Sequence, residues 1–126
     1  MVARLSFAYA RTELRCGYPV EQWLGHQDTS DYRVIRWLRI EPQREHFFVS
    51  VSEVFDDGSP TFLDVYAFEP VDPDEVFSAA ATFGDADEAL HHAVTQLGAQ
   101  PDQFVTAGNI QLVYAEFLAS MRSGAH

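Results

Sequence analysis

The stretch from His46 to Phe68, HFFVSVSEVFDDGSPTFLDVYAF, constrains the fold of this chain most strongly. Two runs rich in Val, Phe, Tyr and Thr flank the sequence Asp-Asp-Gly-Ser-Pro at residues 56–60. β-Branched and aromatic residues favour strands, glycine supplies positive φ, and aspartate satisfies backbone groups in a turn. The pattern predicts a β-hairpin with strands at residues 46–55 and 60–68.

Two more strands are predicted before this hairpin. Residues 2–11 alternate apolar with polar or small side chains, as a strand with one buried face does. Residues 32–41, YRVIRWLRIE, are separated from the hairpin by a short polar link, for which we expect a two-residue turn at residues 43–44. Glycines, a proline and a polar run in residues 12–31 predict a long connecting loop. The result is an antiparallel sheet of about four strands.

The C-terminal part of the chain has helical periodicity. Asp85 is suited to N-cap a helix over residues 86–97, whose apolar positions recur at helical spacing. A second apolar stripe with the spacing i, i+3, i+4, i+7 predicts another helix over residues 108–122. The sequence therefore predicts an α+β fold in which both C-terminal helices pack on one face of the sheet.

Length and composition indicate one globular domain spanning residues 1–126. Hydrophobic residues make up 47% of the chain, which is enough for a real core at this size. The single cysteine, Cys16, excludes an intramolecular disulfide framework, and no secretory signal pattern occurs. The apolar runs are too short to span a membrane. We therefore expect a cytoplasmic protein that does not enter a membrane.

The charge of the chain is strongly negative and unevenly distributed. Eight arginines and no lysine face nineteen acidic residues, for a formal net charge of −11. Residues 45–126 hold one arginine against fourteen acidic residues. Such a field repels phosphate backbones and anionic membranes and attracts basic proteins. The sequence thus predicts no nucleic-acid binding and a protein partner with a basic surface, unless the acidic excess serves solubility alone.

The first candidate site lies on the predicted sheet. The expected strand registers bring Arg36, Glu53 and Asp64 together on one face, beside the aromatic residues Tyr32 and Tyr66. An arginine fork held by a carboxylate among aromatic rings is suited to bind a ligand. A structural ion pair at the margin of the sheet explains the same charges.

The second candidate site is the acidic segment that follows the predicted sheet. Other acidic pairs in the chain are explained by a turn or by helix capping, whereas Asp72, Asp74 and Glu75 have no local structural role. We expect these residues to contact a basic partner. The sequence contains no calcium loop, phosphate-binding glycine loop or catalytic motif, so we predict no cofactor, metal site or catalytic residue.

Two functional hypotheses follow from these patterns. The first is a small acidic, non-catalytic binding protein; in size, charge and α+β composition the chain resembles inhibitors and immunity proteins of bacterial toxins that act on nucleic acid. The second is a small-ligand-binding or enzymatic domain, with a pocket between the 12–31 loop and the aromatic sheet face, anchored by Arg36. The lack of a catalytic motif favours the first. A sheet that is apolar on both faces would also allow a homodimer.

Overall fold

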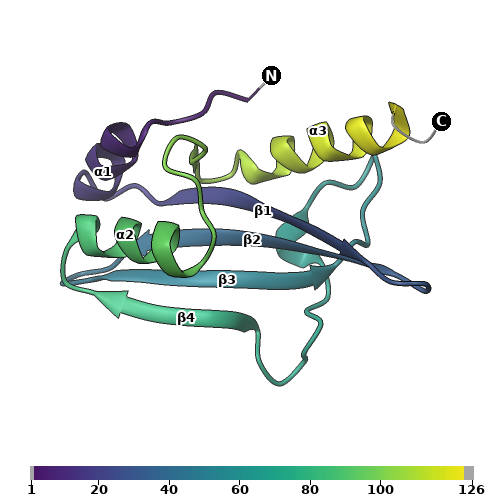
Figure 1. Cartoon of the computed structure of the whole chain (residues 1–126), viewed down its shortest axis with the longest axis horizontal. Coiled ribbons are helices and arrows are strands. Elements are labelled where there is room, and N and C mark those ends of the chain that lie inside the picture. Colours follow the sequence, from purple (N-terminus) through teal and green to yellow (C-terminus); the bar gives the residue numbers. More distant parts are fainter. Residues whose placement is uncertain (1, 124–126) are drawn as a thin grey trace.

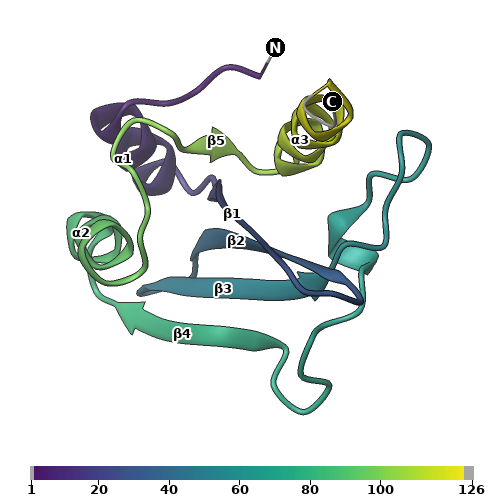
Figure 2. The same ribbon diagram turned by 45° about the vertical axis from the view of Figure 1, so that its right-hand side comes forward.

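The computed structural model describes residues 2–123 and shows three helices around a five-stranded antiparallel sheet with the strand order β4-β3-β2-β1-β5 (Figure 1; β5 is labelled in Figure 2). The elements are, in chain order, α1 (Phe7–Arg15), β1 (Val20–Asp28), β2 (Arg33–Pro42), β3 (Phe47–Phe55), the 3-10 turn η1 (Val65–Ala67), β4 (Phe77–Phe83), α2 (Ala86–Gln96), β5 (Val105–Thr106) and α3 (Ile110–Ser123). No helix within the described residues is long and apolar enough to cross a membrane.

Different helices cover the two faces of the sheet. Leu38 of β2 pairs with Val51 of β3, and both belong to the core that α1 and α2 complete. Successive strand residues point to opposite faces. Trp37 and Val54 therefore lie on the other side of the sheet, in a second core to which α3 contributes. We call the side with Leu38 and Val51 the first face, and the side with Trp37 and Val54 the second face.

The α+β class is confirmed, and four of the predicted elements lie close to their predicted positions. β2, β3, α2 and α3 correspond to the predictions at residues 32–41, 46–55, 86–97 and 108–122, with ends that differ by at most two residues. The link between β2 and β3 is longer than a two-residue turn, so the register differs by two residues from the expected one. A shift of two residues leaves every side chain on its predicted face.

The prediction that both C-terminal helices pack on one face was wrong. Phe104 belongs to the core of the first face, whereas its neighbour Val105, in β5, belongs to the core of the second face. The chain therefore changes from the first face to the second at β5, the short edge strand that pairs with β1. Gln22 secures the connection, because its side chain accepts from the backbone N–H of Gln100 at 2.7 Å and donates to the carbonyl of that residue at 2.9 Å.

The strand predicted at residues 2–11 was also wrong, because helix α1 begins within it. Ser6 caps this helix by accepting a hydrogen bond from the backbone N–H of Tyr9. Ala10 and Leu14, four residues apart, are the buried side chains of the helix and pack on the first face. Tyr9, which the alternating pattern would bury, is 66% exposed. The short alternation in the sequence is therefore a coincidence of composition.

Residues 12–31 do not form the long loop that their glycines and polar residues predicted, because they contain strand β1. The strand passes Gly25 through a register shift between Trp23 and Gly25, and Gly25 has a φ of 117°. A β-bulge of this kind uses the freedom of glycine at positive φ. The polar end of the strand extends beyond the core, where residues 26–28 are exposed. With β1 and β5, the sheet has five strands instead of about four.

The central hairpin prediction placed the wrong partner beside β3. β3 pairs with β4, and residues 60–68 form an irregular segment with the short turn η1. We call residues 56–76 the excursion, since they leave the sheet after β3 and return at β4 (Figure 2). The excursion is tied back to β3 by a bridge between Val54 and Pro70. Its β-prone residues Val65 and Phe68 serve as core side chains of the second face.

Gly58 is required for close packing rather than for positive φ, which the hairpin prediction assumed. Gly58 does not have a positive φ, unlike Gly17, Gly25, Gly98 and Gly108. A Cβ at this position would lie 2.6 Å from Cζ of Phe68 and would also collide with the ring and hydroxyl of Tyr114. Tyr114 is fully buried, so it has no free space into which it can move.

We expect Gly58→Ala to destabilise the protein by about 1–3 kcal/mol, because the added methyl group overpacks the second-face core. Gly84→Ala is the matched control, since a Cβ there meets no atom within 4 Å. Denaturant unfolding of both variants measures the difference. Equal stabilities of the two variants would contradict the packing of Gly58 against Tyr114 and Phe68.

Candidate binding site

A groove of about 610 Å³ opens on the second face of the sheet. The excursion and the start of β4 contribute to its lining, together with residues of β2 and β3. The groove is lined by Trp37, Arg39, Ser52, Val54, Val65, Tyr66, Phe68, Pro70, Val76 and Phe77. Apolar and aromatic side chains with a few polar groups are typical of ligand-binding grooves, and the volume lies within the usual range of about 300–1,000 Å³.

The buried carboxylate of Glu21 fixes one side of this groove. Glu21 is completely inaccessible to solvent. The hydroxyl of Tyr66 donates to its carboxylate and lies 2.8 Å from Oε1 and 2.7 Å from Oε2. Arg39 donates to it at 2.8 Å, and the backbone N–H of Gly108 donates at 2.9 Å. Both carboxylate oxygens are therefore occupied. A buried charge is tolerated only with such partners, so Glu21 holds the structure and is not available as a general base.

Tyr66 and Trp37 form the aromatic part of the groove. Their rings meet edge to face, with centroids 5.2 Å apart and an interplanar angle of 88°. Burial raises the pKa of the Tyr66 phenol well above its usual value, and its hydrogen bond to the Glu21 carboxylate raises the pKa further. The phenol therefore stays protonated and keeps donating to Glu21. Tyr66 cannot rotate out of the groove without breaking that bond.

The charged groups beside the groove have an excess of negative charge. Arg39 donates to Glu21 and also to Glu41, at 3.2 and 3.3 Å. Burial lowers the pKa of Arg39, but its hydrogen bonds to these two carboxylates outweigh burial, so the pKa is raised and the guanidinium stays charged. Two carboxylates thus face one guanidinium. A neutral or cationic group fits this site better than an anion.

A smaller pocket of about 170 Å³ lies beside the start of β4 and is acidic. Its lining consists of Glu53, Val71, Asp72, Glu75 and Ser78. Glu53 belongs to the first face, because it is on the same side of β3 as Val51. The segment of residues 70–78 therefore contributes to both sites, with Pro70, Val76 and Phe77 lining the groove and the remaining lining residues facing the acidic pocket.

The structure brings some of the predicted site residues together and separates others. Arg36 and Glu53 are direct partners across β2 and β3, with Nε and Oε2 3.4 Å apart. Asp64 does not join them, because it precedes η1 in the excursion, is exposed, and forms no ion pair within residues 2–123. Tyr66 lies in the groove on the opposite face from Arg36. Tyr32 is half-exposed and packs edge-on against Phe55, with centroids 5.2 Å apart.

The predicted acidic residues divide in the same way. Asp72 and Glu75 line the acidic pocket with Glu53. Asp74 is exposed next to them, and its backbone N–H donates to Oδ1 of Asp72 at 2.9 Å. Within the described part of the chain, none of Asp72, Asp74 and Glu75 forms an ion pair. These carboxylates are thus available to a partner.

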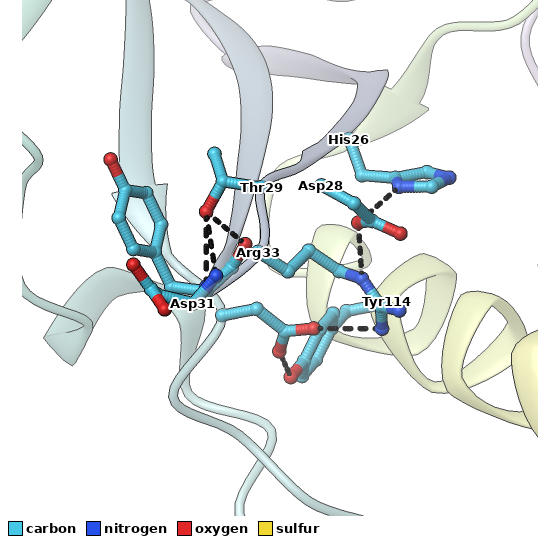
Figure 3. A network of polar contacts seen from close by, with 8 residues as sticks. His26, Asp28, Thr29, Asp31, Arg33 and Tyr114 are labelled. Carbon is cyan, nitrogen blue, oxygen red and sulfur yellow. Dashed lines mark hydrogen bonds and ion pairs between the residues drawn. The ribbon is translucent and has the colours of Figure 1, made fainter.

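A polar network at the tip of the β1–β2 hairpin is structural (Figure 3). Arg33 donates to Asp28 at 2.7 Å and to Asp56 at 3.4 Å, and Tyr114 of α3 donates to the other oxygen of Asp56. His26 contacts Asp28 at 3.1 Å. The hydrogen bond from Arg33 is the main cause that lowers the pKa of Asp28. The network joins the hairpin tip and the end of β3 to α3.

Sequence reasoning missed Glu21, Arg39 and the β4 side of the groove. Glu21 lies in the segment predicted as a loop, where the run Val20-Glu21-Gln22-Trp23-Leu24 places an acidic residue among the apolar residues Val, Trp and Leu. A lone carboxylate in such a run is a signal of a buried, partnered charge. No group of three or more His, Cys, Asp or Glu residues that could hold a metal ion occurs within residues 2–123.

Comparisons with known proteins found no match to this chain among protein-family models, curated proteins or solved structures.

We expect Glu21→Gln to destabilise the protein by about 3–5 kcal/mol, because the fully buried amide replaces one of two acceptor oxygens by a donor and removes the charge that faces the partly buried guanidinium of Arg39. Glu41→Gln is the control, since Glu41 is partly exposed and pairs with the same guanidinium. Its loss should cost less than about 1 kcal/mol. Thermal and denaturant unfolding measure both values. A Glu21→Gln variant as stable as Glu41→Gln would show that the carboxylate is not essential.

The phenols of Tyr66 and Tyr114 should ionise later than free tyrosine, because burial is the main cause that raises both of their pKa values. In the unfolded chain both ionise near pH 10. Their contribution to stability is therefore fully present below pH 10 and is lost as the pH rises above it. Ultraviolet titration of phenolate should show two phenols that ionise at a higher pH than free tyrosine. Tyr66→Phe and Tyr114→Phe should each remove one of these two transitions. A wild-type titration in which every phenol ionises near pH 10 would contradict the burial of Tyr66 and Tyr114 and their hydrogen bonds to Glu21 and Asp56.

Proposed function

We propose that this protein is a small, non-catalytic binding protein that engages a basic segment of another protein. The observation that carries the proposal is the apolar and aromatic groove on the second face, together with segment 72–75, which lies in the chain between the groove residues Pro70 and Val76 and whose carboxylates form no ion pair within the described residues. An apolar groove supplies binding energy, and the charges around it select the partner. The groove is the part of the second-face core that α3 and the excursion leave open, and the carboxylates of Asp74 and Glu75 form no hydrogen bond within the described residues.

The distribution of ion pairs supports a basic partner. Arg4, Arg11, Arg33 and Arg39 form ion pairs with Glu116, Asp87, Asp28 and Glu21, so the arginines of the N-terminal part are largely used within the fold. The acidic residues of segment 72–75, in contrast, form no ion pair within residues 2–123. Their field accelerates the approach of a basic protein and weakens as salt is added.

The groove is suited to hold an arginine or lysine side chain of the partner. The methylene stem would pack on apolar residues such as Val76, while the cation would lie against the rings of Trp37, Tyr66 or Phe77. The negative bias from Glu21 and Glu41 favours this cation. In protein interfaces, such buried arginine and aromatic contacts provide most of the binding energy.

The partner class that fits this chemistry best is a basic protein that itself binds nucleic acid. Such proteins present clustered arginine and lysine residues, and an acidic protein that covers this cluster would inhibit them. The proposal thus retains the inhibitor or immunity role expected from the acidic profile, together with a cytoplasmic location.

A second candidate function is binding of a small neutral or cationic molecule in the same groove. The volume of about 610 Å³ favours it, and so does Trp37, whose buried indole N–H lacks a hydrogen-bond partner among the described residues. The pocket expected from the sequence, between residues 12–31 and the sheet, is not where this groove lies. Arg36 would not anchor the molecule, because it projects from the other face.

Selection of peptides from a random library against the full chain tests the proposed function. We expect the selected peptides to be rich in Arg and Lys and to bind at association rates that fall as ionic strength rises. The variant with Asp72→Asn, Asp74→Asn and Glu75→Gln should bind them at least about tenfold more weakly. Surface plasmon resonance measures both quantities.

The control for this experiment removes the same number of charges elsewhere, with Glu13→Gln, Asp31→Asn and Asp102→Asn, none of which lines either site. It should change the affinity much less than the variant of segment 72–75. Peptides without basic residues, or equal effects of the two triple variants, would overturn the proposal.

A further inference from the structure

Strand β4 forms one edge of the sheet, and its outer side is unpaired. The strand order β4-β3-β2-β1-β5 leaves β4 with a neighbour on one side only (Figure 1). An unpaired strand offers a row of backbone N–H and C=O groups to which another extended chain can bind. The other edge differs, because β5 has two residues and the chain continues from there into α3.

The register identifies the free groups. The backbone N–H of Phe55 donates to Glu69, and the carbonyl of Glu53 accepts from Val71, so odd-numbered residues of β3 direct their backbone groups toward the β4 side. Opposite them on β4 are Ala79, Ala81 and Phe83. Backbone groups alternate in direction along a strand. The N–H and C=O groups of Ala80 and Thr82 therefore point away from the sheet, and both residues are exposed.

This edge lacks most of the features that prevent strands from pairing. Charged side chains, prolines and bulges normally protect an exposed edge. The sequence of β4, FSAAATF, contains no charge and no proline. A register shift at its start, opposite Val51 and Ser52, is the one irregularity of the strand. The remaining residues form a regular, uncharged edge that is open to a further strand.

The charges around β4 decide which chain fits. Residues 69–88 contain seven acidic residues and no Arg or Lys. In a second copy paired antiparallel on β4, segment 72–75 of each copy would lie beside residues 85–88 of the other, so that carboxylates face carboxylates. Arg11 and Arg15 offset only Asp87 among them. These carboxylates would attract the arginines or lysines of a basic segment, whereas they would repel the carboxylates of a second copy.

We propose that β4 accepts an extended segment of the basic partner as a sixth strand, with Arg or Lys beside residues 72–75. This inference rests on the proposed function and specifies how the partner binds. Ala80 pairs with Ser50 and Phe77 pairs with Ser52, on the same face as Trp37. An added strand therefore presents every second side chain next to the groove. Backbone hydrogen bonds would supply affinity, while the groove and the carboxylates would supply specificity.

The test uses the full chain and a synthetic peptide of alternating valine and threonine with arginines at both ends, followed by fluorescence anisotropy. Ala80→Pro removes an outward N–H and places a ring on the edge, so it should weaken binding at least about tenfold. Ala80→Lys should also weaken binding, whereas Ala80→Glu should bind the peptide at least as well as the wild type. Thermal unfolding of each variant checks that the sheet is intact.

Peptides with N-methyl groups on alternate residues test the same contact without changing the protein. Methylation of the residues that face β4 should abolish binding, and methylation of the other set should preserve it. If Ala80→Pro fails to fold, the methylated peptides and the Ala80→Lys and Ala80→Glu pair still decide the question. Unchanged binding of both methylated peptides would overturn the proposal.

The outcomes separate this inference from the proposed function. If the variant of segment 72–75 loses binding while Ala80→Pro retains it, the edge contact is wrong and the proposed function stands. If the peptide fails to bind at low salt and the library selection yields no basic peptides, the proposed function itself fails. A dimer in sedimentation equilibrium that Ala80→Pro abolishes would assign the edge to a second copy and overturn the inference.

Discussion

The buried carboxylate of Glu21 holds together segments that are far apart in the chain. It projects from β1 and binds Arg39 of β2, Tyr66 of the excursion and the backbone of Gly108 before α3. A charge with no solvent access is stable only while all of these partners are present. Glu21 therefore fixes Tyr66, and with it one side of the groove, while the bridge between Val54 and Pro70 holds the end of the excursion to β3.

The two apolar faces of the sheet are covered by different kinds of segment. Both are apolar and need cover, but only the first receives two helices, whose residues Ala10, Leu14, Ala89 and Leu90 pack closely on it. The second face is covered by α3 and by the irregular excursion. An irregular segment does not fill the space over a sheet as a helix does. The part of the second face between the excursion and β4 is left as the groove.

Charge and shape point to the same region of the molecule. The acidic pocket, the groove and the free edge of β4 all include residues from 70–83. The arginines are mostly paired within the fold, whereas segment 72–75 forms no ion pair among the described residues and lies next to free backbone groups and apolar surface. A basic, extended segment satisfies all three features at once, which is why we favour it over a small ligand or a second copy.

The sequence by itself determined the elements with local signals. The capping residue Asp85, the apolar stripe of α3 and the β-prone runs of β2 and β3 predicted those elements within one or two residues, and composition located the acidic segment 72–75. Local signals also misled, since alternation in residues 2–11 occurs within a region that folds as α1. Only the tertiary structure decided which strand pairs with β3, which face each helix covers, and that Glu21 is buried. Strand pairing and burial depend on contacts between residues distant in the chain, and residues 60–68 show the consequence: their β-prone side chains stabilise the second-face core without entering the sheet.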